Sequence, residues 1–274
     1  MKRFVVLTTL LAGLAASVPA LAEGGTSDSS SSAKIGAVAS KDLASGFDDK
    51  NSPFEKANTT YHFVGARFRY IIIPQFYMGL FGSGGTTVGV PAFGPEFTIR
   101  KNGLEYVLSA MYASYAMDPT PFKAKTDGND AWELVDTNIK ALYLMSDFLW
   151  SSEINPKFSI NYGAGFGIAA VFGDIHRVQA HPVGDPNNPA SYQPCVAPGN
   201  PPGTGGYCGG DNDHYGNYTE PSWANGGSKP IIFPWLSVQT GIRFKPVKQF
   251  AARLDIGWNL LNGPFFGLAG NYGL

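Results

Sequence analysis

Residues 158–173 read FSINYGAGFGIAAVFG, and their side chains change character at every second position. The even-numbered positions, from Phe158 to Phe172, are mostly large and apolar. The odd-numbered positions are small or polar, beginning with Ser159 and Asn161. Because successive side chains of a strand point to opposite faces, this period of two predicts a β-strand with one apolar face.

Three glycines of this segment, Gly163, Gly165 and Gly167, superficially suggest a nucleotide-binding motif. A dinucleotide fingerprint has the spacing G-x-G-x-x-G and opens a helix. Here the spacing is G-x-G-x-G, and the alternation continues through the glycines without a helix start. We therefore expect no cofactor, and we interpret the glycines as residues that face a crowded barrel interior.

The same alternation predicts seven further strands, which gives eight in all, an even number typical of single-chain outer-membrane barrels. In the segment 135–150, the expected apolar face runs from Val135 to Tyr143, and the pattern slips between Met145 and Asp147. We interpret this slip as a bulge. The seven segments are residues 62–73, 88–100, 104–117, 135–150, 232–245, 249–261 and Phe266 to Leu274.

The connections between the predicted strands alternate in length. Short polar turns follow the second, fourth and sixth strands, near 100–103, 151–157 and 245–249. The other connections are 74–87, 118–130, 174–230 and 262–264, and only the last of these is short. Short turns on one side and long loops on the other are typical of a membrane barrel whose N-terminus is periplasmic.

The N-terminus predicts export. Lys2 and Arg3 precede an apolar run that ends in Ala20-Leu21-Ala22, so we expect residues 1–22 to be a secretory signal peptide. Residues 23–58 are polar and of low complexity, and we expect a flexible periplasmic segment. Residues 59–274 would form the barrel.

The composition narrows the partners of the chain. Only 15% of the residues are charged, below the usual ~25%, while aromatic residues reach 14%. The formal net charge is −1, so the chain lacks the basic character of a nucleic-acid-binding protein.

The signal peptide, the alternating strands, the turn lengths and the C-terminal strand FFGLAGNYGL together resemble one protein class. This class is the small eight-stranded bacterial outer-membrane barrels, such as the OmpA transmembrane domain, OmpX, OmpW and PagL. The resemblance covers about residues 60–274. It implies an all-β fold, a closed antiparallel transmembrane β-barrel of up-and-down topology, in contact with outer-membrane lipids. We expect a monomer. A secreted β-sandwich remains the alternative fold, and the turn lengths favour the barrel.

Charged residues on the predicted inward faces carry both signs. Unpaired charges in such an interior would cost several kcal/mol each. We therefore expect an ion-pair network, with a narrow pore or gate as the alternative. The expected members are Arg67, Arg69, Glu96, Arg100, Glu105, Asp136, Lys140, Arg243, Arg253 and Asp255.

The connection 174–230 is the candidate functional segment, because such long loops are usually functional or disordered. Cys195 and Cys208 are the only cysteines, and in an exported chain they predict a disulfide. We expect this loop to be extracellular and to offer a site for a ligand or partner.

Two groups of residues in or near this loop are candidates for chemistry. Asp174 and His176 would share one strand face, but no serine is placed beside them, so we expect no catalytic residues. Asp211, Asn212 and Asp213 lack the spacing of a calcium loop, so we expect no metal.

Several aromatic residues suit the interfacial girdles of a barrel. The expected girdle residues are Tyr112, Phe148, Trp150, Trp235 and Trp258.

The predicted function is a structural or surface-interaction role through the long loop, without catalysis. The alternatives are a narrow conduit for small or hydrophobic molecules and a lipid-modifying enzyme.

Overall fold

A computed structural model describes residues 53–204, 206–209, 214–216 and 218–274 of the chain. The predicted signal peptide, most of the polar segment 23–58 and the weighed calcium site at 211–213 lie outside the described residues. In the described part of the chain, no helix is both long enough and apolar enough to cross a membrane.

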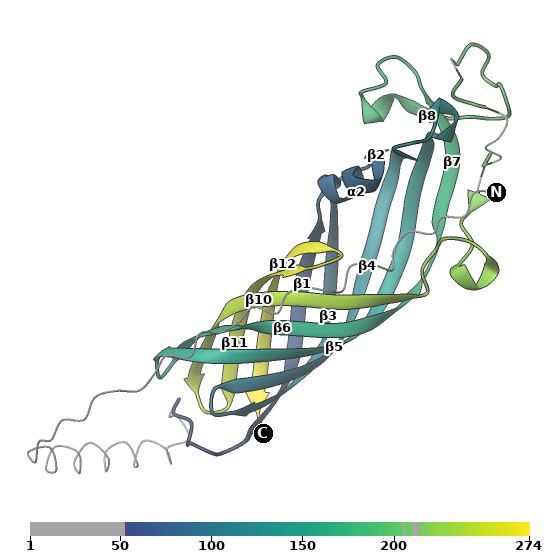
Figure 1. The fold of residues 1–274 in the computed structure, drawn as a ribbon. Coiled ribbons are helices and arrows are strands. Elements are labelled where there is room, and N and C mark those ends of the chain that lie inside the picture. The colour runs from purple at the N-terminus through teal and green to yellow at the C-terminus, as the bar shows by residue number, and fades with distance from the viewer. Residues whose placement is uncertain (1–52, 205, 210–213, 217) are drawn as a thin grey trace, which may run out of the picture. The chain divides into compact units, whose positions relative to one another are not determined.

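Eight strands pair edge to edge in a closed ring, and every neighbouring pair is antiparallel (Figure 1). The strands follow each other around the ring in chain order, and the last one pairs with the first. This confirms the predicted up-and-down barrel, and it contradicts the β-sandwich because a single sheet closes on itself. The strands are β1 (Tyr61–Ile73), β3 (Val88–Lys101), β4 (Leu104–Ala124), β5 (Glu133–Asn155), β6 (Phe158–Phe172), β10 (Ile232–Val247), β11 (Phe250–Asn259) and β12 (Gly263–Gly273).

The two ends of the barrel differ, and we call them the turn end and the loop end. At the turn end, two residues connect β3 to β4, β5 to β6 and β10 to β11. The first of these turns is Asn102-Gly103, with φ values of 49° and 79°. Left-handed backbone at both positions matches the twist of the flanking strands, which explains the Asn-Gly pair.

The loop end carries the additional elements. β4 and β5 continue past the ring, and β7 pairs with the outer part of β5, so that these strands project beyond the barrel (Figure 1). The additional elements are α2 (Gln75–Phe81), β2 (Gly82–Gly84), η1 (Asn129–Ala131), β7 (Ile175–Pro182), η2 (Pro189–Ser191), β8 (Tyr192–Pro194), β9 (Tyr218–Thr219) and η3 (Trp223–Asn225).

The outward face of the ring is apolar, as predicted. In β6, Phe166 and Ile168 are 53% and 58% exposed, whereas Asn161 on the opposite face is 1% exposed. Exposed apolar side chains continue over the neighbouring strands, for example at Leu254 and Leu268. An apolar belt around a closed ring, with charges inside it, is the arrangement of a transmembrane barrel that contacts lipid.

The prediction for β5 was wrong about which face points inward. Ala141 and Tyr143 are buried inside the ring, while Leu142 and Leu144 are exposed on the outside. The predicted bulge near Met145 is also absent, since β4 and β5 pair in continuous register there. The inward face of β5 changes from apolar to charged along the barrel, so the sequence pattern slips although the register does not.

One predicted girdle residue is also misplaced. Trp235 is 1% exposed and lies inside the barrel, because it shares the inward face of β10 with Ser237. Phe148, Trp150 and Trp258 are exposed on the outside, as a girdle requires.

Candidate functional site

A cluster of charged side chains fills the turn-end part of the barrel interior, and we call it the charge plug. It contains six cations and five carboxylates, and ion pairs connect them. Its members are Glu55, Arg67, Arg69, Glu96, Arg100, Glu105, Asp147, Arg243, Lys245, Arg253 and Asp255.

Asp147 of β5 lies at one side of the plug and holds two arginines of β1. Its Oδ2 is 2.5 Å from Arg67 Nη1 and 3.0 Å from Arg69 Nη2. Arg67 Nε also pairs with Glu96 at 2.7 Å, and Arg69 donates to Gln239 Oε1 at 2.7 Å. Asp147 and both arginines are at most 2% exposed, so their charges are balanced by each other, by Glu96 and by polar neighbours rather than by water.

Arg253 of β11 joins the two halves of the plug. Its Nη2 lies 3.1 Å from Glu96, its Nη1 lies 3.4 Å from Glu105, and its Nε lies 3.0 Å from Asp255. Asn271 of β12 donates a further hydrogen bond of 2.6 Å to Glu96. These contacts alone connect four strands, β3, β4, β11 and β12.

Glu55 completes the plug from outside the ring. Its carboxylate lies 2.7 Å from Arg100 Nε, 2.8 Å from Lys245 Nζ and 3.4 Å from Arg243 Nη2. Burial alone would raise the pKa of Glu55, but these three cations lower it to about 2. The end of the segment expected to be flexible, residues 53–58, thus lies against the turn end of the barrel.

The centre of the plug contains little free space. The cavity among Glu105, Arg243 and Arg253 measures about 10 Å³, roughly what one water molecule requires. Above the plug, the Arg69 guanidinium lies 4.6 Å from the ring centre of Phe265 and 5.4 Å from that of Trp235. Charged and aromatic layers therefore follow each other along the interior.

Eight of the ten residues expected in the interior network lie in the plug, and Asp136 and Lys140 do not. Lys140 donates to the backbone oxygen of Asn138 instead. Asp136 and Lys140 occupy even-numbered positions of β5, whereas the odd-numbered positions of this strand face inward.

Three plug residues were not predicted from the sequence. Asp147 was hidden by the supposed bulge, and Glu55 lies in a segment without periodicity. Lys245 could have been found, because it continues the inward face of Ser237 and Arg243.

The long connection between β6 and β10 comprises residues 173–231, and we call it the outer loop. Strand pairing and ion pairs hold its base in place. Arg177 of β7 bridges two carboxylates, with Nη2 2.6 Å from Glu133 and Nη1 2.7 Å from Glu220. Burial would raise the pKa of Glu220, but hydrogen bonds from Ser228 and the pairing with Arg177 hold it below its usual value. His214 Nδ1 lies 2.5 Å from Glu133 Oε1.

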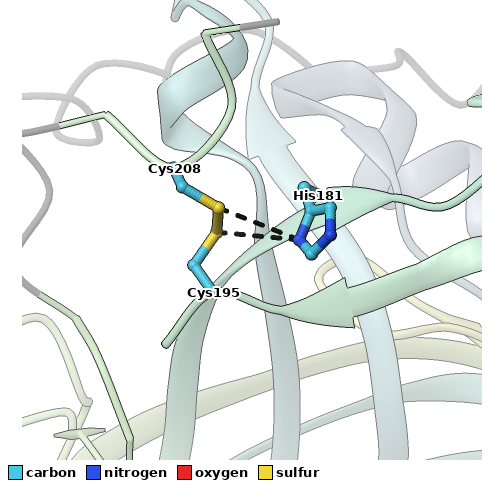
Figure 2. Close-up of side chains that lie close together, drawn as sticks. All are labelled: His181, Cys195 and Cys208. Carbon is cyan, nitrogen blue, oxygen red and sulfur yellow. Dashed lines mark hydrogen bonds between the residues drawn. A yellow bond between two sulfur atoms is a disulfide. The ribbon is translucent and has the colours of Figure 1, made fainter. Parts of the chain in front are cut away.

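The predicted disulfide between Cys195 and Cys208 is confirmed, and both residues are buried. Figure 2 shows the imidazole of His181 directed at the two sulfurs, with Nδ1 3.9 Å and 3.8 Å away. Three donors at this spacing resemble a metal site. A cysteine binds a metal as its thiolate, however, and neither sulfur is a thiolate while the disulfide is formed.

Asp174 and His176, considered as a catalytic pair, have different partners. The Asp174 carboxylate lies 3.3 Å from Lys229 Nζ, and His176 Nδ1 lies 3.2 Å from the hydroxyl of Thr219. This geometry lacks the base–acid contact that activates a nucleophile.

Comparison with known proteins gives structural similarities alone. No family model and no curated protein matches the chain. Among solved structures, Neisserial surface protein A matches with a TM-score of 0.39 and 8% identity over 78% of this chain and 96% of the other. Ail of Yersinia pestis, in complex with the heparin analogue sucrose octasulfate, matches with a TM-score of 0.35 and 12% identity over 78% and 97%.

A third similar structure is the N-terminal β-barrel domain of Pseudomonas aeruginosa OprF. It matches with a TM-score of 0.29 and 13% identity over 80% of this chain and all of the other. The closed ring and its apolar belt establish the barrel from this chain's own residues.

Proposed function

We propose that the chain is a bacterial outer-membrane protein whose outer loop mediates contacts at the cell surface. The barrel acts as the anchor, with its turn end in the periplasm and its loop end outside. The observation that carries this proposal is the contrast between the two parts. The turn-end part of the interior is closed by the charge plug, while the outer loop is stabilised by its own ion pairs and disulfide.

The base of the outer loop supports an interaction role because it is held in place. β7 pairs with the outer part of β5, and Arg177 connects Glu133 of β5 to Glu220 at the other end of the loop. A loop fixed at both ends loses less conformational entropy when it binds a partner. Exposed apolar side chains on this support, Val196 at 67% and Trp223 at 55%, offer contact area.

The charge plug argues against a conduit. A permeating molecule would have to separate buried ion pairs, and breaking one such pair costs about 3–5 kcal/mol. The partners of Asp174 and His176 likewise give no support to a lipid-modifying enzyme. We therefore propose that the protein neither conducts nor catalyses.

The experiment compares the wild type with a variant in which residues 184–216 are replaced by a short Gly/Ser linker. Both ends of the excision, Gly184 and Gly216, adopt left-handed backbone in open space, which suits a linker. Both proteins are placed in nanodiscs and tested against immobilised extracellular-matrix proteins and glycans.

The proposal predicts that the wild type binds at least one immobilised molecule and that the loop variant, still folded as a barrel, binds it at least tenfold more weakly. Equal binding by both proteins would contradict the role of the loop. Conductance steps from the wild type in a planar bilayer would contradict the closed interior.

A further inference from the structure

A second feature of the interior lies at the loop end, on the far side of the charge plug. A cavity of about 320 Å³ is present there, open to its surroundings rather than sealed. The inward faces of β4 and β5 form one wall, and α2 contributes Met78. Residues that line it include Ile73, Met78, Val88, Met117, Ile139 and Phe233.

The lining of this cavity is almost entirely apolar. None of the residues around it carries a charge. Its principal polar group is a cluster of Tyr115, Tyr143 and Asn262, in which the two hydroxyls lie 2.5 Å apart and Asn262 Nδ2 donates to Tyr115 at 3.3 Å. Two hydroxyls share one hydrogen bond, so one hydroxyl proton remains to be donated to a guest.

On the side of the plug, the cavity is lined by Tyr143, which stands on an aromatic floor. The ring of Tyr143 meets that of Trp235 edge-on at 5.3 Å, and Trp235 packs against Phe265 at 5.7 Å. Arg69 of the charge plug lies against the other side of these rings. Because the floor rests on the plug, the space is a pocket with a closed bottom.

Water is a poor occupant of such a pocket. A volume of about 320 Å³ corresponds to roughly ten water molecules at ~30 Å³ each, and each water needs two to four polar partners. The Tyr115–Tyr143–Asn262 cluster can serve only a few. Poorly hydrated apolar pockets favour apolar guests, and a cavity of ~150 Å³ accommodates benzene. This one is about twice that size.

We propose that this cavity is a binding site for one small, uncharged, apolar molecule, comparable in size to a two-ring aromatic compound or a short acyl chain. The apolar walls hold its body, and a single oxygen atom accepts a hydrogen bond from the tyrosine pair. A charged group is excluded, since the pocket has no counter-charge. The site goes beyond the proposed role of the outer loop and does not depend on it.

Binding is tested with 2-naphthol as the probe, on the full chain in lipid nanodiscs. Ile139→Trp fills the cavity, and Leu142→Trp is the matched control because Leu142 lies on the outward face of the same strand and is 48% exposed. We expect saturable binding by the wild type and the control, and at least tenfold weaker binding by Ile139→Trp. Binding no greater than in empty nanodiscs, or equal in all three proteins, would overturn the proposal.

A second variant keeps the test decisive if Ile139→Trp does not fold. The double variant Tyr115→Phe/Tyr143→Phe removes both hydroxyls of the pair and leaves the apolar walls intact. It should weaken 2-naphthol binding several-fold while naphthalene binds as before. An equal loss for both compounds would contradict the assigned hydrogen bond.

Two sources could supply such a guest, an acyl chain of a membrane lipid or a free apolar molecule. Solvent extraction of the purified protein followed by mass spectrometry distinguishes them. A lipid that is extracted from the wild type and is absent from Ile139→Trp identifies the membrane as the source. Saturable 2-naphthol binding without any such lipid identifies a free molecule.

Discussion

Asp147→Asn should destabilise the barrel more than any other removal of a single carboxylate at the centre of the plug. Asp147 is fully buried and pairs with both Arg67 and Arg69. The substitution preserves the size of the side chain but removes its charge. Arg67 retains its pair with Glu96 at 2.7 Å, whereas Arg69 is left with the neutral Gln239 and the sulfur of Met145.

The magnitude follows from the burial of the two arginines. Breaking a buried ion pair by removing one partner costs about 3–5 kcal/mol, because an uncompensated charge stays in a medium of low polarity. Since Arg67 keeps one carboxylate, we expect a loss near the lower limit, about 3 kcal/mol. Adding Arg69→Leu to the same chain removes the stranded cation, and about 2 kcal/mol should return.

The assay is reversible urea unfolding in lipid vesicles, followed by tryptophan fluorescence. Asp118→Asn is the matched control, because Asp118 is exposed and outside the plug, and it should change the free energy of unfolding by less than about 0.5 kcal/mol. A loss below 1 kcal/mol for Asp147→Asn, or a further loss upon adding Arg69→Leu, would refute the plug as a set of mutually compensating charges.

Three further predictions concern the periphery of the plug, its packing, and the outer loop. The pKa of Glu55 is lowered from 4.5 to about 2, so the stabilisation from its ion pairs is complete above pH 4.5 and decreases as the pH falls towards 2. The difference in unfolding free energy between wild type and Glu55→Gln, at most ~3 kcal/mol, should therefore shrink by more than half between pH 6 and pH 3. A constant difference would contradict the ion pairs. Gly165→Ala would place a methyl group against Asp147 Oδ1 and should cost about 1–3 kcal/mol, whereas Gly270→Ala, which meets nothing within 4 Å, should be neutral in the same urea assay. Replacing Cys195 and Cys208 together by serine should make the outer loop sensitive to limited proteolysis, because the ~3 kcal/mol expected from closing such a loop is lost. The gel mobility of the folded barrel should stay unchanged. An outer loop that stays intact under the same protease treatment would show that the disulfide is dispensable.

The barrel itself could be predicted because a lipid-facing side chain is apolar on every strand. The alternation of Phe158 to Phe172 needs only the period of a strand, and the short turns between strands follow from local chemistry such as Asn102-Gly103. These features act over a few residues, so a single sequence is sufficient to detect them.

The interior could be predicted only where it is charged. At the turn end the inward residues are polar, and Arg67, Glu96 and Arg253 were placed correctly inside the ring. At the loop end the interior becomes apolar, so Ala141 and Trp235 gave the signal of lipid-facing residues. A period of two identifies the faces of a strand, but the interior face is distinguishable only while its polarity differs from that of lipid.

Contacts made from outside the periodic segments could not be predicted. Glu55 reaches Arg100, Arg243 and Lys245, which are distant in sequence, and nothing in its own neighbourhood marks that contact. The pairing of β7 with the outer part of β5 likewise depends on where two long segments meet in space.

The orientation of β6 towards lipid can be measured directly by cysteine scanning of residues 158–172 with a nitroxide label in bilayers. The native cysteines form a disulfide and stay unlabelled without a reductant. We predict that collision of the label with oxygen dissolved in the lipid is frequent at the even-numbered positions from Phe158 to Phe172 and rare at the odd-numbered positions between them. Equal accessibility along the segment, or access of a water-soluble relaxation agent to the even-numbered positions, would contradict a barrel embedded in the membrane.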